Sequence, residues 1–379
     1  MNNEILYDIA IIGGGVGGLT LAIQLAKQHY RVILFEKERY PFHKVCGEYI
    51  SLESKDFLES LGWPLQHMNL PVIKKLNITS PDGTILKANL PLGGFGISRY
   101  TIDNDLKNIA VQAGVSILEN CKAEEAVLVN EIFNIQTTAG EFKSRVCCGS
   151  FGKRSNLDIK WKRSFITRSN NKLNDFVGFK YHIQTNFAMD TIALHNFKNG
   201  YCGISKIEDD KYCLCCLSSI SNLKESNNSF EQMEKNILSR NPFLKDIFEN
   251  ATKLFKQPIT ISHISFNQKT QVENNILLFG DAAGMITPLC GNGMSMAMHA
   301  GKIAAGFISA FLQGKISRQQ MEMNYTTQWK KTFAKRLRTG RMIQRFFRKI
   351  RVTNLFVKAM KLSPSLTRLL IRQTHGESF

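Results

Sequence analysis

Short apolar runs at the start of the chain predict a strand, a helix and a second strand. Residues 5–12 form an apolar run that ends at glycines, which indicates a buried strand. Leu19, Ala22 and Ala26 then recur at helical spacing. A second apolar run at residues 31–35 completes a strand–helix–strand unit of about 30 residues, the size typical of parallel sheets.

The pattern changes in the middle of the chain. Pro81-Asp82-Gly83 lies between two apolar runs, which predicts a hairpin over residues 71–91. Residues 153–212 mix β-branched and aromatic residues with polar ones, as antiparallel strands do. The other predicted elements are a helix over 103–114, a strand over 116–118, a helix over 229–248, a strand over 275–279, and helices over 292–311 and from 321 onward.

The composition narrows the class of protein. A length of 379 residues corresponds to two or three structural units of roughly 150 residues each. The apolar share of 43% and the charged share of 21% are typical of a globular protein. They exclude a disordered chain, a collagen and a small disulfide scaffold.

The cysteines and the N-terminal residues indicate in which cellular compartment the protein is expected. The nine cysteines have no regular spacing and form no pair of Cys-x-x-Cys motifs that would indicate zinc. We therefore expect reduced thiols, no metal site and a cytoplasmic location. Glu4 and Asp8 argue against a signal peptide, and the absence of any run of 18 apolar residues argues against a transmembrane helix.

A glycine loop joins the first strand to the first helix. Gly13, Gly15 and Gly18 follow the Gly-x-Gly-x-x-Gly pattern, which permits a tight turn and lets a pyrophosphate approach the helix N-terminus. Glu36 ends the second strand, where a carboxylate can bind ribose hydroxyls and repel a 2′-phosphate. FAD or NAD is thus favoured over NADP. The residues assigned to this nucleotide site are Gly13, Gly15, Val16, Gly17, Gly18, Glu36 and Lys37.

A second motif identifies the dinucleotide. Residues 276–294, which read ILLFGDAAGMITPLCGNGM, resemble the Gly-Asp motif of the para-hydroxybenzoate-hydroxylase-like flavoproteins. The resemblance implies FAD, with Asp281 on the flavin ribitol and Pro288 beside the isoalloxazine ring. It also implies that the helix start faces the pyrimidine edge of the flavin, where N–H groups stabilise negative charge. The flavin-site residues are Gly280, Asp281, Pro288, Gly291, Asn292, Gly293 and Met294.

Three further segments resemble the same superfamily, above all its geranylgeranyl reductase group. Residues 148–155, which read CGSFGKRS, are similar to the Gly-Lys/Arg-Arg-Ser form of that group. Residues 44–48, KVCGE, resemble its Cys-Gly-Gly loop near the flavin, with Glu48 replacing the second glycine. Arg99, before a predicted helix, matches an arginine near the flavin. The resemblance implies cofactor contacts for Lys44, Cys46, Gly47 and Arg99. From the chemistry of the residues themselves, we consider catalytic roles for Cys46, as a thiol that gates the flavin ring or donates a proton to substrate, and for Glu48, as a catalytic acid.

Each of these residues has a structural alternative. Cys46 can be a buried apolar residue beside a turn, Glu48 a solvated carboxylate, and Arg99 a surface residue at a helix start. The wider superfamily also contains flavin halogenases, but Trp63, Trp161 and Trp329 do not form their Trp-x-Trp-x-Ile-Pro motif.

Two other signals are weak or missing. Only Tyr201 remains of the Tyr-x-Trp-x-Phe-Pro motif of the reductases, which speaks against a prenyl-chain substrate. No second strand–glycine loop–helix unit is present, so NADPH or NADH would bind transiently.

The charge of the chain is concentrated near its C-terminus. The formal net charge is +18, and residues 330–372 contain 14 Lys or Arg and no Asp or Glu. Apolar residues recur there at helical spacing, so we predict a basic amphipathic segment. It could cap the protein, bind an anionic membrane surface at the inner membrane face, or bind an acidic carrier protein. The helical period argues against nucleic acid.

The predicted fold is an α/β fold. A three-layer, Rossmann-like FAD-binding domain carries an inserted smaller antiparallel-sheet substrate domain and a helical C-terminus. The FAD-binding domain comprises residues 1–70, 97–155 and 265–325, the substrate domain residues 71–96 and 156–264, and the basic C-terminal region residues 326–379.

The sequence leaves the reaction open. We expect a FAD-dependent dehydrogenase or reductase that moves a hydride between flavin N5 and a lipophilic or carrier-presented substrate, a small hydrophobic molecule. One alternative is a single-component monooxygenase that uses NAD(P)H and oxygen on an aromatic or polyketide-like substrate. Another is a non-catalytic membrane- or partner-binding protein that uses the basic tail.

Overall fold

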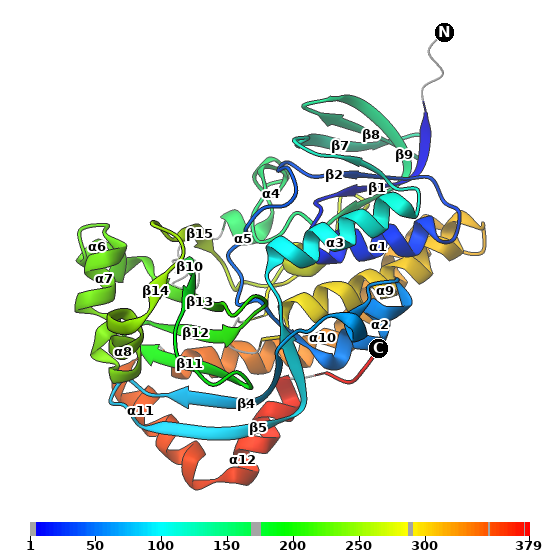
Figure 1. The fold of residues 1–379 in the computed structure, drawn as a ribbon. Coiled ribbons are helices and arrows are strands. Elements are labelled where there is room, and N and C mark those ends of the chain that lie inside the picture. Colours follow the sequence, from blue (N-terminus) through cyan, green and yellow to red (C-terminus); the bar gives the residue numbers. More distant parts are fainter. Residues whose placement is uncertain (1–4, 168–175, 287–290, 348, 375) are drawn as a thin grey trace.

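Two sheets and a set of helices make up the molecule (Figure 1). The structure is a computed structural model, and it describes residues 5–167, 176–286, 291–347, 349–374 and 376–379. The predicted α/β fold, with a parallel strand–helix–strand unit, an antiparallel second sheet and a helical C-terminus, is confirmed.

The first sheet has the order β16-β17-β9-β1-β2-β6, with β7 and β8 extending it from β9. Strands β17, β9, β1, β2 and β6 run parallel, and the helices α1, α3 and α9 lie on one side of them (Figure 1). Its elements are β1 Leu6–Ile12, α1 Val16–Ala26, β2 Val32–Phe35, α3 Arg99–Gln112, β6 Ser116–Leu118, β7 Ala123–Val129, β8 Ile132–Thr137, β9 Gly140–Gly149, β16 Val272–Glu273, β17 Ile276–Leu278 and α9 Gly293–Leu312.

The second sheet has the order β14-β10-β13-β12-β11-β4-β5-β3, with β15 also paired to β10. All of its neighbours are antiparallel except β4 and β11. Its strands are β3 Tyr49–Ser51, β4 Val72–Thr79, β5 Ile85–Gly96, β10 Phe176–Gln184, β11 Thr191–Phe197, β12 Gly200–Lys206, β13 Tyr212–Ser219, β14 Thr252–Lys253 and β15 Ile259–Ile264. Strand β3 therefore lies in the second sheet, although our division assigns residues 1–70 to the first unit.

The remaining helices connect and cover the sheets. The α-helices are α2 Lys55–Ser60, α4 Asn156–Lys160, α5 Ser164–Thr167, α6 Ile220–Glu225, α7 Phe230–Asn236, α8 Pro242–Asn250, α10 Arg318–Phe346, α11 Ile350–Leu362 and α12 Pro364–Thr374. The short 3₁₀ turns are Leu52–Ser54, Leu65–His67, Leu238–Arg240 and Gly280–Ala282. Helix α10 packs on α9, whereas α11 and α12 lie against β5 (Figure 1).

Three local predictions are wrong for identifiable reasons. The predicted helix over 229–248 is split, because the Asn241 side chain caps a new helix at Pro242. The predicted strands over 153–212 begin only at β10 within the described residues, since a capping box at Ser155 starts the short helix α4 instead. Cys202 and Cys216 are not reduced, because they face each other across β12 and β13 and form a disulfide.

Helix α9 is long and apolar enough to cross a membrane by length and composition. It packs between α1 and α10, and Met298, Ala304 and Ile308 on it are fully buried in the main core. This packing accounts for its apolar character. No other helix in the described part of the chain meets the same criteria.

Candidate functional site

The glycine loop between β1 and α1 leaves no room for side chains. Gly13 has a φ of +105°, and a Cβ on it would come within 2.5 Å of the Ser150 carbonyl oxygen. A Cβ on Gly18 would collide with the Gly13 carbonyl oxygen. Gly15 precedes α1 and offers no side-chain cap, so the N–H groups of the first turn, which includes Val16 and Gly17, remain available to a ligand.

Glu36 holds this loop from the end of β2. Its buried carboxylate accepts hydrogen bonds from the Gly14 amide at 2.9 Å and from the Glu38 amide at 3.1 Å. Lys37 lies away from the loop on the surface, where it pairs with Glu38 at 3.6 Å. The structure therefore brings Glu36 to the predicted nucleotide site but does not place Lys37 there.

Two cations stand over the loop and share one carboxylate, which we call the Asp103 group (Lys44, Arg99 and Asp103). Asp103 accepts from Lys44 Nζ at 3.0 Å and from Arg99 Nη2 at 2.7 Å. Burial would raise the pKa of this carboxyl, but the adjacent Arg99 and Lys44 lower it. A Cβ on Gly15 would lie 3.2 Å from Arg99 Nη2 and 3.9 Å from Lys44 Nζ. Two cations beside a free helix N-terminus fit a pyrophosphate.

The second predicted motif lies at the end of β17 and the start of α9. Gly280 and Gly291 adopt positive φ values of 59° and 68°, and Gly293 begins α9. A small cavity there is lined by Gly280, Asp281, Gly284, Ile286, Gly293, Met296 and Trp329. Pro288 lies outside the described residues. The structure thus places Asp281 and Gly293 around one small cavity.

Asn292 and Met294 point elsewhere. The buried Asn292 amide donates to the Thr374 carbonyl oxygen at 2.7 Å, so the last turn of α12 is bonded to the start of α9. Met294 is buried in the main core. Both residues support the helix start rather than line the cavity.

Buried cations that the sequence analysis missed support the Gly280–Ala283 turn. Lys269 Nζ donates to the Asp281 carbonyl oxygen at 2.7 Å, and burial lowers the pKa of this lysine to about 8. Arg163 Nη1 donates to the Ala282 carbonyl oxygen at 2.9 Å and pairs with buried Asp158 at 2.7 Å. Neither residue belongs to a pattern that sequence spacing reveals.

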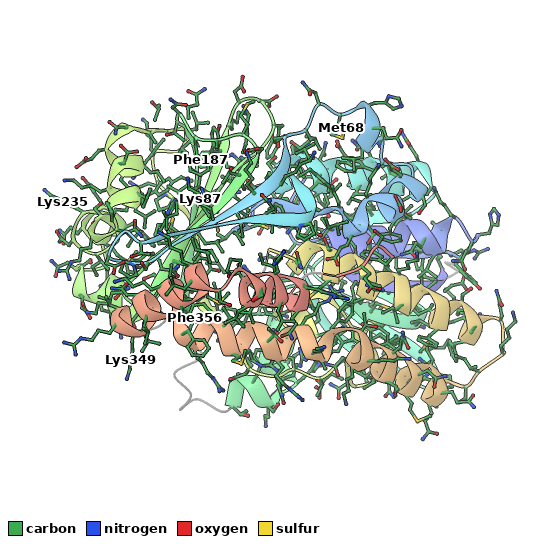
Figure 2. All side chains as sticks on the ribbon, turned by 90° about the horizontal axis from the view of Figure 1, so that it is seen from below. Met68, Lys87, Phe187, Lys235, Lys349 and Phe356 are labelled. Atoms are coloured by element: carbon green, nitrogen blue, oxygen red, sulfur yellow. A yellow bond between two sulfur atoms is a disulfide. The ribbon has the colours of Figure 1, made fainter. Side chains whose placement is uncertain are left out.

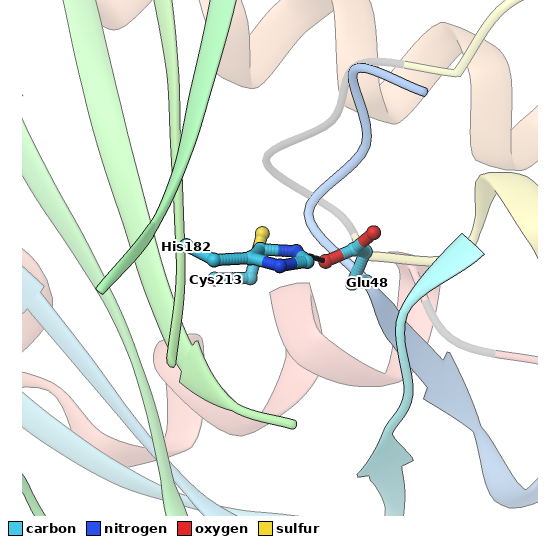
Figure 3. Close-up of side chains that lie close together, drawn as sticks. All are labelled: Glu48, His182 and Cys213. Atoms are coloured by element: carbon cyan, nitrogen blue, oxygen red, sulfur yellow. Dashed lines mark hydrogen bonds and ion pairs between the residues drawn. The ribbon is translucent and has the colours of Figure 1, made fainter. Parts of the chain in front are cut away.

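The Lys44–Glu48 loop leads to a second buried charged site, which we call the Glu48 cluster (Glu48, Lys180, His182 and Cys213). Glu48 has a φ of +54° and is fully buried. Its Oε1 accepts from Lys180 Nζ at 2.7 Å and from the Arg99 amide at 2.9 Å. Its Oε2 lies 2.6 Å from His182 Nε2 (Figure 3). Burial would raise the pKa of Glu48, but Lys180 and His182 lower it to about 2.

The sheet register explains why these residues meet. Lys180 and His182 alternate on β10 and stand opposite Cys215 and Cys213 on β13, so all four side chains share one face. Glu48 raises the pKa of the Lys180 ammonium against the effect of burial, which keeps it charged. Burial raises the pKa of Cys215 to about 12, so this thiol stays neutral.

Cys46 and Gly47 lie between the two groups. The Cys46 carbonyl oxygen accepts from the Cys213 thiol at 3.2 Å, and the Gly47 carbonyl oxygen accepts from Ser205 Oγ at 3.3 Å. A Cβ on Gly47 would meet no atom within 4 Å. The loop therefore faces open space at this point, where a ligand can approach.

The Glu48 cluster has the ligand types of a metal site. One ligand atom each from Glu48, His182 and Cys213 lies within 4.8 Å of the others. However, both Glu48 oxygens already accept strong hydrogen bonds, and the Lys180 ammonium at 2.7 Å would repel a cation. We interpret the group as an ion-pair network.

Lys180 and His182 were not among the predicted site residues, although the sequence contains a signal for them. Both lie two residues apart within an otherwise apolar strand, FVGFKYHIQ. Charged residues inside a buried strand are rare unless they are paired, so their spacing indicates one polar face. Which carboxylate pairs with them could not be read from the sequence, because Glu48 is 132 residues away from Lys180.

Comparisons with known proteins agree with this geometry. The family model described as "FAD dependent oxidoreductase" matches residues 8–45. "Uncharacterized protein MJ1520" from Methanocaldococcus jannaschii is 32% identical, over 95% of this chain and 89% of its own length. A digeranylgeranylglycerophospholipid reductase from Methanospirillum hungatei is 25% identical, over 97% of this chain and 93% of its own. The solved structure of the flavin-dependent brominase Bmp2 has a TM-score of 0.79 and 20% identity, covering 98% of this chain and 93% of that one.

The fold, the glycine loop and these matches define a flavoprotein. The chain belongs to the family of FAD-dependent oxidoreductases, and it is an enzyme whose cofactor is FAD. Two features fit the pyrophosphate of FAD: the crowded glycines of the first loop and the cations of the Asp103 group. The small cavity beside Gly280 and Gly293 marks the second motif.

Proposed function

We propose that this enzyme is a reductase that adds hydrogen across a carbon–carbon double bond of a lipophilic substrate. The similarity to a digeranylgeranylglycerophospholipid reductase over nearly the full length of both chains supports this choice. A polyprenyl chain on a lipid is therefore the first substrate class to test. Because only Tyr201 remains of the reductase motif, a substrate presented by a carrier protein is the second substrate class to test.

The observation that carries the proposal is the Glu48 cluster beside the Cys46-Gly47 loop. Reduction of a double bond needs a hydride on one carbon and a proton on the other. FAD, once reduced by NADPH or NADH, supplies the hydride from N5. The protein must supply the proton, and the cluster holds two N–H donors, Lys180 and His182, on one buried carboxylate.

We assign the proton to His182, because the imidazolium form of this ring carries an N–H at Nδ1 in addition to the one at Nε2 that Glu48 binds. Glu48, ionised by its low pKa of about 2, cannot itself act as the acid. It instead orients the His182 ring through Nε2, and Lys180 keeps Glu48 ionised. Cys46, Lys44, Arg99 and Asp281 would contact the cofactor in this proposal.

A row of rings connects His182 to solvent. The His43 ring lies 5.2 Å from the His182 ring and 4.7 Å from the Tyr100 ring, and Tyr100 is 41% exposed. Burial, together with Lys180 and His182, lowers the pKa of His43 to about 4. His43 is therefore neutral at pH 7 and adds no positive charge beside Lys180 and His182.

Hydroxylation is the runner-up. A hydroxylase would deliver the electrons of the flavin to oxygen, and the product would gain an oxygen atom. The brominase Bmp2 shares the fold, but a similarity at 20% sequence identity does not indicate which reaction this chain catalyses.

Product analysis tests the proposal. The holoprotein, reduced with dithionite in the absence of oxygen, is incubated with a digeranylgeranyl phospholipid, and the products are analysed by mass spectrometry. We expect a gain of two hydrogens for each double bond reduced, and a loss of this activity in His182→Gln. His195→Gln, which alters another buried histidine of the same sheet, is the matched control and should keep the activity. A product that forms only with NADPH and oxygen, and contains an added oxygen atom, would establish the hydroxylase instead.

A further inference from the structure

Helix α11 has two apolar stripes instead of one. Thr353, Val357 and Met360 form the buried stripe, and Val357 and Met360 pack in a small core with Leu86 of β5. Val352, Leu355 and Leu362 recur at helical spacing on the opposite side and are 38%, 70% and 85% exposed. Burial in this chain explains the first stripe but not the second.

Helix α12 repeats the arrangement. Its buried side consists of Thr367, Ile371 and Thr374. Leu366 and Leu369 lie on the other side and are 42% and 49% exposed. Helices α11 and α12 contact each other, and both pack on β5. Their outer leucines therefore point away from the same sheet, and we call them the α11–α12 surface (Leu355, Leu362, Leu366 and Leu369).

Cations surround these leucines. Arg351, Lys358, Lys361, Arg368 and Arg372 are all exposed. There is no Asp or Glu between residues 330 and 372. One carboxylate from another element, that of Asp82, lies 3.3 Å from Lys358. Exposed leucines among such an excess of cations are typical of helices that lie in the interface of an anionic membrane.

We propose that the α11–α12 surface binds an anionic lipid bilayer, with the four leucines in the interface and the cations on the lipid phosphates. A second copy of this chain is a poorer occupant, because the same excess of cations would face itself across a symmetric contact. This inference goes beyond the proposed reaction and holds for whatever chemistry the flavin performs.

The position of α12 gives this surface a functional consequence. Ile371, on the inner side of α12, packs with Tyr49 and Leu90, and the Thr374 carbonyl oxygen accepts from Asn292 at the start of α9. Helices α11 and α12 lie on the lower side of the molecule in Figure 1, the side from which Figure 2 is viewed. Helix α12 would therefore lie between a bilayer on this side and the start of α9.

Vesicle sedimentation tests the surface. The full-length holoprotein is mixed with phosphatidylcholine vesicles that contain or lack phosphatidylglycerol. We expect binding to the anionic vesicles only, weakened by salt. Leu355→Ser/Leu362→Ser/Leu366→Ser/Leu369→Ser should weaken it about 100-fold, and Arg351→Gln/Lys361→Gln/Arg368→Gln/Arg372→Gln by a similar factor.

A matched control comes from the opposite end of the molecule. Val127 and Val129 on β7 are also about half exposed, at 47% and 48%, and Val127→Ser/Val129→Ser should bind as the wild type does. Unchanged flavin absorbance in each variant shows that the fold is retained. The inference is overturned if the wild type does not bind anionic vesicles, if the leucine variant binds as well as the wild type, or if the leucine substitutions instead convert a dimer into a monomer in solution.

Discussion

The Asp103 group and the Glu48 cluster each pair one buried carboxylate with two nitrogen donors, yet they arise differently. Arg99 and Asp103 are one helical turn apart, and Lys44 reaches them over the glycine loop. Glu48 and Lys180 are 132 residues apart and come from the loop and from the second sheet. The Arg99–Asp103 pair follows from local helix geometry. Lys44, which is 59 residues from Asp103, and the whole Glu48 cluster depend on tertiary contacts.

This difference separates binding from chemistry. The Asp103 group places cations where a pyrophosphate binds, so we expect it to govern cofactor affinity. The Glu48 cluster lies where the loop meets the second sheet, so we expect it to govern turnover. The Arg99 amide donates to Glu48 at 2.9 Å, which joins the two groups in one network.

The largest expected effect concerns the glycine loop beneath the Asp103 group. In Gly18→Ala the new Cβ collides with the Gly13 carbonyl oxygen, so we expect loss of FAD and a fall in unfolding free energy of about 3 kcal/mol. Gly306→Ala is the same substitution in α9, where a Cβ meets nothing within 4 Å. It should keep FAD and gain about 0.5–1 kcal/mol. Flavin absorbance and thermal melts measure both, and a yellow Gly18→Ala protein would contradict the assignment of the loop.

The next effect separates chemistry from binding. Glu48→Gln removes the charge that orients His182 and pairs with Lys180, so we expect turnover to fall about 100-fold or more. The flavin should remain bound with the affinity of the wild type, as measured by titration of the apoprotein with FAD. If FAD affinity falls while turnover at saturating FAD is kept, the roles assigned to the two groups are reversed.

As the pH falls, the unfolding free energy should decrease first through buried histidines such as His195, before Asp103 or Glu48 is protonated. Burial lowers the pKa of His195 to about 4, so the folded form stays neutral while an unfolded histidine binds a proton below about pH 6.5. Stability present above pH 6.5 is therefore lost as the pH falls towards 4, by about 2 kcal/mol for this residue at pH 5. Denaturant unfolding at pH 7 and pH 5 should show a smaller loss in His195→Gln, and an equal loss in both proteins would contradict the burial argument.

The smallest effect is expected at the Asp103 group. Asp103→Asn keeps both cations near the loop but releases them from their carboxylate, so we expect FAD affinity to change by about tenfold. Turnover at saturating FAD should match that of the wild type. A loss of turnover without a change in affinity would show that Asp103 belongs to the chemistry.

The sequence predicted what depends on neighbours along the chain. The parallel unit, the hairpin, the glycine loop and Glu36 are local patterns, and the structure contains each of them. Cys46, Gly47, Glu48 and Arg99 were identified as one site only through resemblance, and their cofactor roles stay predictions.

The features that the sequence did not predict depend on tertiary contacts, which the spacing of residues along the chain does not reveal. Lys180 and His182 meet Glu48 because β10 pairs with β13 and faces the loop. The disulfide between Cys202 and Cys216 depends in the same way on the register of β12 and β13. Helix propensity alone also could not predict the break at Asn241-Pro242, which a capping side chain imposes.

The reaction of the reduced enzyme with substrate tests the central claim most directly. Wild type and His182→Gln, both loaded with FAD and reduced, are mixed rapidly with the lipid substrate without oxygen while flavin absorbance is followed. We expect the substrate to reoxidise the wild-type flavin, and to reoxidise the flavin of His182→Gln about 100-fold more slowly from the same initial spectrum. Equal rates in the two proteins, or a flavin that stays reduced until oxygen is admitted, would contradict it.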